Sequence, residues 1–311
     1  MKTSIRFSYL YLGLCLIVSV LGYLITPDQS RYCNTQVLEN SFLNPGTKKC
    51  FLNSNNSTSR TIEDIVFGKE DFTKLILDLG GTSNCKLYIL GTDRYGRDLL
   101  SRLIIGMRYT LIISLLSVLF ACFIGIIAGS FAGYYGGRTD KIISFFVGIF
   151  WALPTILLAF VILMSFGRNI TSLCVAIGLT LWADIARLVR GQVIAFKENN
   201  FVSSAIVLGF SDMRIILSQI FPNIAGPILI QFSGNFALAV LLESGLSFLG
   251  MGLQAPVPTL GNILQDQYTQ AFNGQILQSS IPAIVLVLLI LSFQLLASEY
   301  RDKLDVKLIN R

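Results

Sequence analysis

The chain has 311 residues, of which only 14% are charged, whereas a soluble domain averages about 25%. Hydrophobic residues make up 53% of the chain and the mean hydropathy is +0.66, which indicates a polytopic membrane protein. The sequence has no histidine, which excludes Ser-His-Asp and Cys-His nucleophile pairs and every zinc site that needs imidazole. The net charge of +6 arises outside residues 27–98, where nine basic side chains balance nine acidic ones. A basic surplus at the ends of apolar segments is typical of membrane topology and does not indicate nucleic-acid binding.

Six apolar stretches are each long enough to cross a bilayer, which takes about 20 residues of helix. They are residues 9–25, 110–132, 142–166, 170–186, 224–250 and 280–297. The first predicts an uncleaved N-terminal transmembrane helix over residues 1–26, because no A-x-A-like cleavage site follows it. Lys and Arg concentrate in both tails and in the connections at 138–141 and 187–214, whereas residues 251–279 have none. The positive-inside rule therefore predicts that both termini are cytoplasmic.

Residues 27–98 differ from the rest because they are rich in Asn, Ser and Thr, and they predict an external loop or small subdomain. Three cysteines fall in this region, Cys33, Cys50 and Cys85. An oxidising exterior permits one disulfide among them, and the sequence leaves the pairing open.

Residues 99–311 then form a core with five transmembrane helices. Within this core, Gly125, Gly129 and Gly133 predict close helix packing, and Pro154 and Pro227 predict kinks.

The connection over residues 196–222 is far longer than the few residues needed to join two helices. It predicts two short helices, 200–208, with Phe201, Ala205 and Leu208 on one apolar face, and 212–221. Gly209 stands where a left-handed cap is expected, and Pro222 is expected to end the second helix. Because this hairpin lacks a face rich in Lys and Arg, it is expected to dock into a protein groove rather than lie on lipid.

Three segments carry a family resemblance. Residues 201–223 resemble the cytoplasmic EAA loop of the permease subunits of binding-protein-dependent ATP-binding-cassette (ABC) importers; their sequence is FVSSAIVLGFSDMRIILSQIFPN. GTDRYGRDLLSRLIIGMRYTL (91–111) and ESGLSFLGMG (243–252) are similar to blocks of the dipeptide, oligopeptide and nickel permease family, in particular its C-type subunit. The resemblance implies the all-α fold of an ABC type I importer permease with six transmembrane helices, in the bacterial inner membrane. It implies transport of peptides by alternating access, with nickel as the alternative substrate.

The resemblance also implies partners. They are a second homologous permease, two ATP-binding subunits that use ATP and Mg, and an external substrate-binding protein. This chain contains no G-x-x-x-x-G-K-[ST] phosphate loop, so it is expected to bind no cofactor or metal itself and not to be an enzyme. An intramembrane enzyme is disfavoured because no paired carboxylates or metal cluster is visible. An ion-coupled secondary transporter stays open as an alternative, although no clear inverted repeat is visible.

Several residues follow from the resemblance as site candidates. In the loop 196–222, which the resemblance implies docks on the ATPase, they are Phe201, Ser203, Ser204, Ala205, Gly209, Asp212 and Pro222. The family's usual Glu-Ala-Ala is replaced here by Ser203-Ser204-Ala205. In the external motif they are Gly91, Thr92, Asp93, Gly96, Arg97 and Asp98. This motif either shapes the outer mouth where the binding protein docks, or is a helix start capped by Thr92 or Asp93, with Arg97 and Arg102 at lipid phosphates.

Two residues of the fifth apolar stretch, Asn235 and Glu243, are candidates for the pathway or its gate. A carboxylate inside a membrane is costly, which points to a function for Glu243. The favoured alternative is that Glu243 lies near the outer interface and pairs locally.

Overall fold

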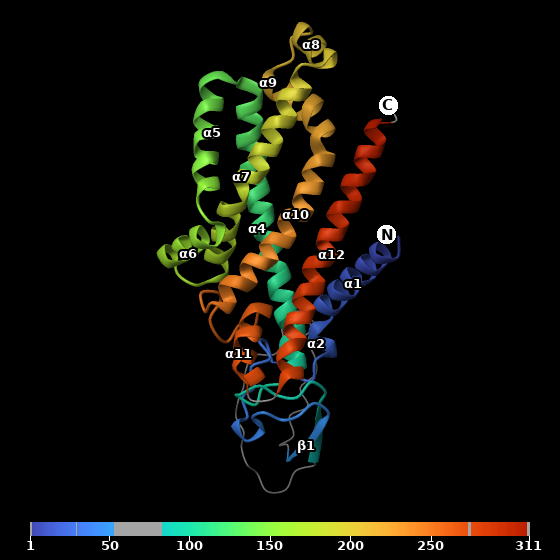
Figure 1. Ribbon diagram of the computed structural model, residues 1–311, viewed down its shortest axis with the longest axis vertical. Helices are drawn as coiled ribbons and strands as arrows, with labels where there is room; N and C mark the ends of the chain where they lie inside the picture. Colours follow the sequence, from blue (N-terminus) through green and yellow to red (C-terminus); the bar gives the residue numbers. More distant parts are fainter. Residues whose placement is uncertain (1, 29, 53–82, 273–274, 310–311) are drawn as a thin grey trace. The chain divides into compact units, whose positions relative to one another are not determined.

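The computed structural model describes residues 2–28, 30–52, 83–272 and 275–309, and their regular elements are helices apart from one two-stranded sheet (Figure 1). The chain divides into two compact units. Unit 1 contains Met1–Tyr9, Ile113–Glu243 and Leu289–Arg311, and unit 2 contains Leu10–Ile112 and Ser244–Leu288.

The elements in chain order are α1 (Lys2–Val20), α2 (Gly22–Ile25), η1 (Leu38–Asn40), β1 (Thr47–Leu52), β2 (Ser83–Tyr88), α4 (Leu99–Tyr135), α5 (Gly137–Ala152), α6 (Thr155–Phe166), α7 (Ile170–Lys197), α8 (Asn200–Val207), α9 (Asp212–Arg214), η2 (Ile215–Ile220), α10 (Phe221–Phe248), α11 (Leu260–Phe272) and α12 (Ile276–Ile309).

Long apolar helices confirm the prediction of a polytopic helical membrane protein. In the described part of the chain, four helical segments are long and apolar enough to cross a membrane: Leu99–Tyr135, Ile170–Lys197, Asp212–Phe248 and Ile276–Lys303. The pair α5 and α6 adds a fifth if it is counted as one span. The apolar part of the first helix, Arg6–Val20, is shorter than a typical span. The helices therefore account for four or five of the six predicted crossings by length and composition.

The predicted span over residues 142–166 is not one straight helix. It is divided into α5 and α6, whose axes are bent by 97° (Figure 1). Leu153 adopts an extended conformation (φ −96°, ψ 138°) at the break, directly before Pro154. A proline disfavours the α conformation of the residue before it, which explains why the chain breaks at this point. The other predicted kink site, Pro227, lies inside α10.

The core of unit 1 contains a close contact between α4 and α7, as the glycine spacing predicted. The residues of α7 at positions 177, 181, 185, 189 and 193 form a fully buried row with a spacing of four. A Cβ atom on Gly129 would lie 2.8 Å from the Cβ of Val189 and 2.5 Å from the carbonyl oxygen of Ala186. Gly125 and Gly133 meet α7 in the same way. The ridge of α7 therefore fits against a groove that exists only because α4 has no side chains there.

This contact makes a prediction about stability. Gly129→Ala should destabilise the protein by about 1–3 kcal/mol, because the added methyl group forces two helix backbones apart. Gly148→Ala in α5 is the matched control, since a Cβ at position 148 would meet nothing within 4 Å. In an open helical position alanine is more favourable than glycine, so the control should be neutral or slightly stabilising. Thermal unfolding of both purified variants in detergent checks this, and equal midpoints would refute the glycine groove.

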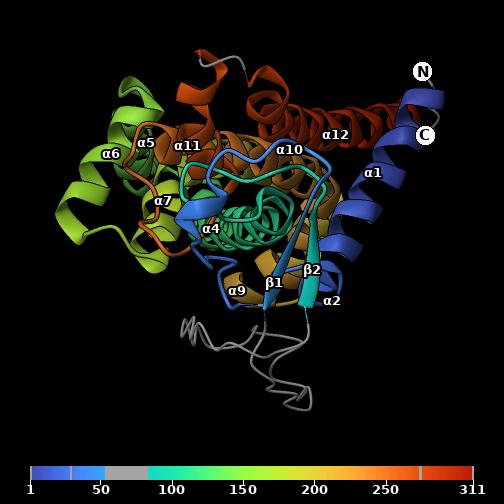
Figure 2. The same cartoon turned by 90° about the horizontal axis from the view of Figure 1, so that it is seen from below.

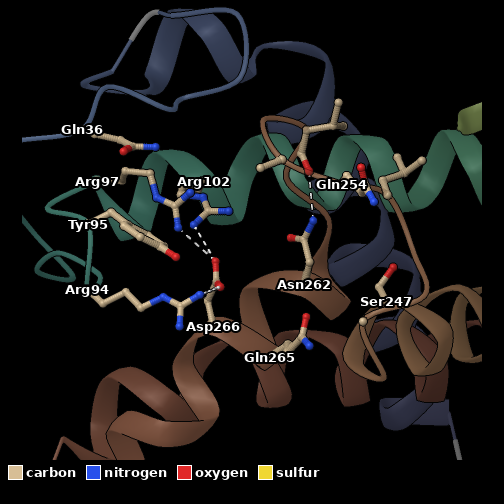
Figure 3. A pocket seen from close by; sticks show the side chains of 14 residues that line it. Gln36, Arg94, Tyr95, Arg97, Arg102, Ser247, Gln254, Asn262, Gln265 and Asp266 are labelled. Atoms are coloured by element: carbon tan, nitrogen blue, oxygen red, sulfur yellow. Dashed lines mark hydrogen bonds and ion pairs between the residues drawn. The ribbon is translucent and has the colours of Figure 1, made fainter. Parts of the chain in front are cut away.

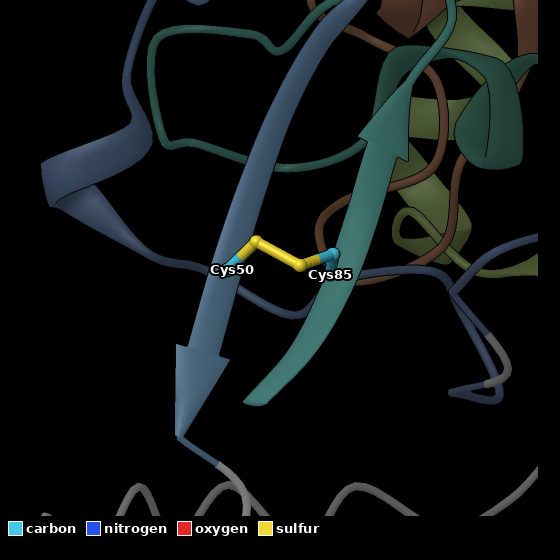
Figure 4. The surroundings of a disulfide bond; sticks show 2 residues. All are labelled: Cys50 and Cys85. Atoms are coloured by element: carbon cyan, nitrogen blue, oxygen red, sulfur yellow. A yellow bond between two sulfur atoms is a disulfide. The ribbon is translucent and has the colours of Figure 1, made fainter. Parts of the chain in front are cut away.

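Unit 2 contains the only strands of the described residues. β1 and β2 pair antiparallel and lie side by side in Figure 2, with Cys50 directly opposite Cys85 in the register. These two cysteines form a disulfide, whereas Cys33 is buried and free (Figure 4). The structure thus identifies the pair that the sequence left open. Residues 53–82, the central part of the predicted external segment, lie outside the described residues, so a subdomain over 27–98 stays a prediction.

Candidate functional site

The first candidate site is the turn formed by residues 91–98 of unit 2, here called the motif turn. Gly91 and Gly96 have φ values of +79° and +72°, a region that favours glycine. A Cβ atom on Gly96 would lie 1.8 Å from the carbonyl oxygen of Val37, and one on Gly91 would lie 2.2 Å from that of Leu43. Thr92 exchanges two hydrogen bonds with Leu43: its hydroxyl accepts from the Leu43 N–H (2.9 Å) and its N–H donates to the Leu43 carbonyl (3.2 Å). The motif turn is therefore fixed against residues 37–43.

Asp93 is the electrostatic centre of the motif turn, and its side chain is fully buried. Its Oδ1 accepts the backbone N–H groups of Tyr95 (2.9 Å) and Arg97 (3.0 Å). Its Oδ2 accepts Nε of Arg97 (2.6 Å) and Nη1 of Arg102 (2.8 Å). Four charge-assisted bonds of this kind compensate the cost of burying the carboxylate.

Asp98, and not Thr92 or Asp93, begins the following helix. α4 starts at Leu99, and Oδ2 of Asp98 accepts the backbone N–H of Ser101 (3.0 Å) and also its hydroxyl proton. This is the N-cap arrangement, in which a carboxylate satisfies a free N–H of the first helical turn. Burial raises the pKa of Asp98 above its usual range, although the bonds from Ser101 oppose that shift. The prediction that Thr92 or Asp93 caps this helix is wrong, because the Thr92 hydroxyl is bonded to Asn40 and Leu43 and the Asp93 carboxylate holds the motif turn and Arg102.

A second carboxylate, Asp266 of α11, completes the charge cluster. It accepts hydrogen bonds from Arg97 (Nη2, 3.0 Å), Arg102 (Nη1, 3.0 Å) and Arg94 (Nη2, 3.1 Å). Arg97 and Arg102 therefore contact carboxylates, which corrects the expectation of contacts with lipid phosphates. The sequence reading missed both α11 and Asp266. One signal was present, because Asp266 is the single charged residue in the stretch 251–279 and so needs a partner from elsewhere in the chain.

The charge cluster forms one side of a cavity of about 440 Å³ within unit 2 (Figure 3). On that side the figure shows Arg94, Arg97 and Arg102 directed toward Asp266, with the Tyr95 ring beside them. The centroid of this ring lies 4.6 Å from the guanidinium carbon of Arg94 and 4.5 Å from that of Arg97. The other side is neutral and carries the polar side chains of Ser247, Gln254, Asn262 and Gln265. The cavity thus has one strongly charged end and one end rich in amide groups.

The second candidate site is the loop 196–222 of unit 1, where α8 ends in a glycine cap. Gly209 has a φ of +77°. Its N–H donates to the carbonyl of Ile206 (2.9 Å), and the N–H of Phe210 donates to that of Ala205 (3.1 Å). This pair of bonds is the Schellman arrangement, which satisfies carbonyls at a helix end and requires a left-handed residue. The predicted cap at Gly209 is therefore confirmed.

The exposed face of α8 differs from the prediction. Val202 and Ala205 are buried, because α8 packs with this side toward η2 and α7. Phe201 and Leu208, which were expected to share a face with Ala205, are exposed to 39% and 72%. Val207 is 87% exposed, and Ser203 and Ser204 are exposed as well. The loop therefore presents uncovered apolar side chains close to its glycine cap, a feature typical of protein contact surfaces.

The second predicted loop helix does not end at Pro222. α9 continues through the π-helical turn η2 into α10, so the helix runs past this proline. The N–H of Phe221 donates to the carbonyl of Ile216, five residues earlier, so the π-helical turn lies directly before Pro222, where proline removes a hydrogen bond from the helix. Asp212 at the start of α9 accepts a hydrogen bond from the hydroxyl of Tyr134 (2.9 Å), which ties this segment to α4.

Asn235 and Glu243 both lie in α10 and are completely buried. Oδ1 of Asn235 accepts the side-chain amide of Gln231 (3.0 Å), and its Nδ2 has no hydrogen-bond partner among the described residues. Burial of both polar groups on one helix is compatible with a role in a pathway. Their function as a pathway or gate stays a prediction.

These features define a helical membrane protein with a capped inter-helix loop and an ion-paired turn before a long apolar helix. Residues 125–304 match the family described as "Binding-protein-dependent transport system inner membrane component". The chain belongs to this family, as the sequence resemblance indicated.

Named relatives agree with this assignment. The chain is 33% identical over 220 residues to the dipeptide transport system permease protein DppC of Lactococcus lactis, which covers 70% of this chain and 63% of that protein. It is 37% identical over 220 residues to the oligopeptide transport system permease protein OppC of Haemophilus influenzae, which covers 71% and 70%. The chain thus aligns with slightly less than two thirds of the first relative's length.

Solved structures support the fold. A chain of the MetNI methionine ABC transporter in an inward-facing conformation superimposes with a TM-score of 0.53 at 18% identity, over 64% of this chain and 95% of that chain. At this identity the likeness establishes that the two chains share a fold.

Proposed function

We propose that this chain is the permease subunit of an ATP-driven peptide importer and forms half of its membrane pathway. Family membership supports the role of permease. Peptides are preferred to nickel as substrate because relatives at 33 to 37% identity are named for dipeptide and oligopeptide transport. Six membrane crossings are proposed, with α1 as the first and the α5–α6 pair as one. Both termini and the loop 196–222 are assigned to the cytoplasm of the bacterium, and the motif turn to the outside.

The observation that carries the proposal is the exposed apolar end of α8 beside Gly209. Val207 and Leu208 leave most of their surface uncovered on a segment whose backbone is fixed by the Schellman bonds. A rigid element with exposed apolar groups suits docking into a groove of another protein. The proposed partner at this loop is one of two ATP-binding subunits, which use ATP and Mg. A second related permease and an external binding protein complete the proposed assembly.

Force would pass from the ATPase to the membrane helices through this loop. α8 follows α7 directly, and α9 is continuous with α10, so movement of the docked loop would act on two long helices at once. Because Ser203 stands where the family has an acidic residue, apolar burial is left as the main source of affinity for the ATPase. The tie between Asp212 and Tyr134 would transmit part of the movement to α4.

Cysteine labelling tests the proposed orientation. Val207→Cys should react with a membrane-impermeant maleimide only in inside-out vesicles, and Lys48→Cys, at an exposed position of β1, only in right-side-out vesicles. The unmodified chain is the control, because its four free cysteines are buried. The reverse labelling pattern would contradict the assignment of the loop to the cytoplasm and so the ATPase contact.

A further inference from the structure

The charge cluster at the cavity of unit 2 has more hydrogen-bond donors than it uses. Three arginines, Arg94, Arg97 and Arg102, meet two carboxylates, Asp93 and Asp266, so one positive charge is in excess. Arg102 is nine-tenths buried, and its Nε has no hydrogen-bond partner among the described residues. An unpartnered buried guanidinium N–H is costly, so the hydrogen bonding of the cluster is incomplete as it stands.

The environment of the cluster favours a further negative charge. Burial lowers the pKa of Arg97, and repulsion from Arg102 lowers it further, against the opposing effect of the two carboxylates. Asp93 is fully enclosed, whereas 17% of the Asp266 side chain is exposed and 44% of that of Arg94 is exposed. A ligand in the cavity therefore meets Arg94 and Asp266 first. The arginine fork matches the geometry of a carboxylate, as it also matches that of a phosphate.

The rest of the cavity indicates what the anion is attached to. The exposed amide side chains of Gln254 and Gln265 also line the cavity, and its volume of about 440 Å³ is that of a site for a small molecule. Amide side chains pair well with peptide groups, because each offers both a donor and an acceptor. Sites for small molecules are typically concave, so the shape favours a short peptide over the binding protein.

From this juxtaposition we infer that the cavity is a binding site for the free C-terminal carboxylate of a short peptide, held by Arg94 and Arg102 in competition with Asp266. The neutral end receives the backbone amides of the last residues. The inference deepens the proposed function and rests on it for the identity of the ligand. In this inference the motif turn contacts the substrate. When no peptide is bound, Asp266 pairs with the arginines in place of the peptide carboxylate.

The test compares trialanine with trialanine amide, which lacks the carboxylate. Binding of each to the full chain in lipid nanodiscs is measured by equilibrium dialysis. Trialanine should bind at least about tenfold more tightly than its amide, the effect of one charge-assisted contact. Arg94→Gln should reduce this preference to less than about threefold, whereas Lys48→Gln, an exposed cation of the same unit that does not line the cavity, should leave it unchanged. Equal binding of the two peptides to the unmodified chain would overturn the inference.

A second variant distinguishes lost binding from lost folding. Asp266→Asn removes the competing carboxylate and should tighten trialanine binding at least about threefold, a gain that a misfolded chain cannot show. Unchanged or weaker binding would count against the competition. If Arg94→Gln instead weakens the association of the external binding protein in the absence of peptide, and peptide and amide bind alike, the carboxylate belongs to that protein and the inference is wrong. ATP-dependent transport by the assembled complex would leave the proposed function standing in either case.

Discussion

Replacing Gly209 with valine is expected to weaken the association with the ATP-binding subunits by at least roughly tenfold. The residue has a φ of +77°, and an L-residue with a Cβ pays about 1–2 kcal/mol in this region, more when it is β-branched. The Schellman bonds at Ile206 and Ala205 would be lost or distorted, which would move Val207 and Leu208 away from their present positions. Co-purification of the ATPase with the tagged chain in mild detergent measures the effect.

Gly209→Asn is the matched control for this variant. Asparagine tolerates the left-handed conformation, so it should keep the cap and most of the association. No Cβ clash complicates either substitution, because nothing lies within 4 Å of a Cβ built at this position. If the valine variant retains full ATPase binding while correctly inserted in the membrane, the assignment of this loop as the docking element fails.

Replacing Asp93 with asparagine is expected to have the largest effect on stability, a loss of about 3–5 kcal/mol. The substitution removes the charge that faces Arg97 and Arg102 and leaves two buried guanidinium groups with one shared carboxylate, Asp266. Thermal unfolding of the purified chain in detergent measures the loss. Glu39→Gln, at an exposed position of the same unit, should leave the midpoint within experimental error. A similar midpoint for Asp93→Asn would mean that the cluster contributes little to the fold.

Hydropathy predicted the helical class and most of the spans, since apolar length is a property of each segment alone. The helix cap at Gly209 could also be predicted from local sequence, because this glycine directly follows an apolar run. The glycines of α4 were also predictable, because small residues spaced by four have one common use in membrane helices. These features depend on neighbours in the sequence.

Two of the features that escaped prediction depend on residues distant in the sequence. The pairing of Cys50 with Cys85 is determined by the register of β1 and β2, and the ion pairs of Asp266 join α11 to a turn more than 160 residues earlier. Other features are close in sequence but depend on how the chain folds back: the buried face of α8 is determined by its contacts with η2 and α7. Helix continuity past Pro222 requires a π-helical turn that no local pattern indicated.

The central claim is that a separate ATPase drives transport through this chain by acting on the loop 196–222. Reconstitution of the chain with its second permease in vesicles, with and without the ATP-binding subunits and with the binding protein present, tests it most directly through uptake of labelled peptide. Accumulation against a gradient only when the ATP-binding subunits and ATP are both present is the expected result. Accumulation that persists without the ATPase, driven by an ion gradient, would contradict the claim and identify a secondary transporter.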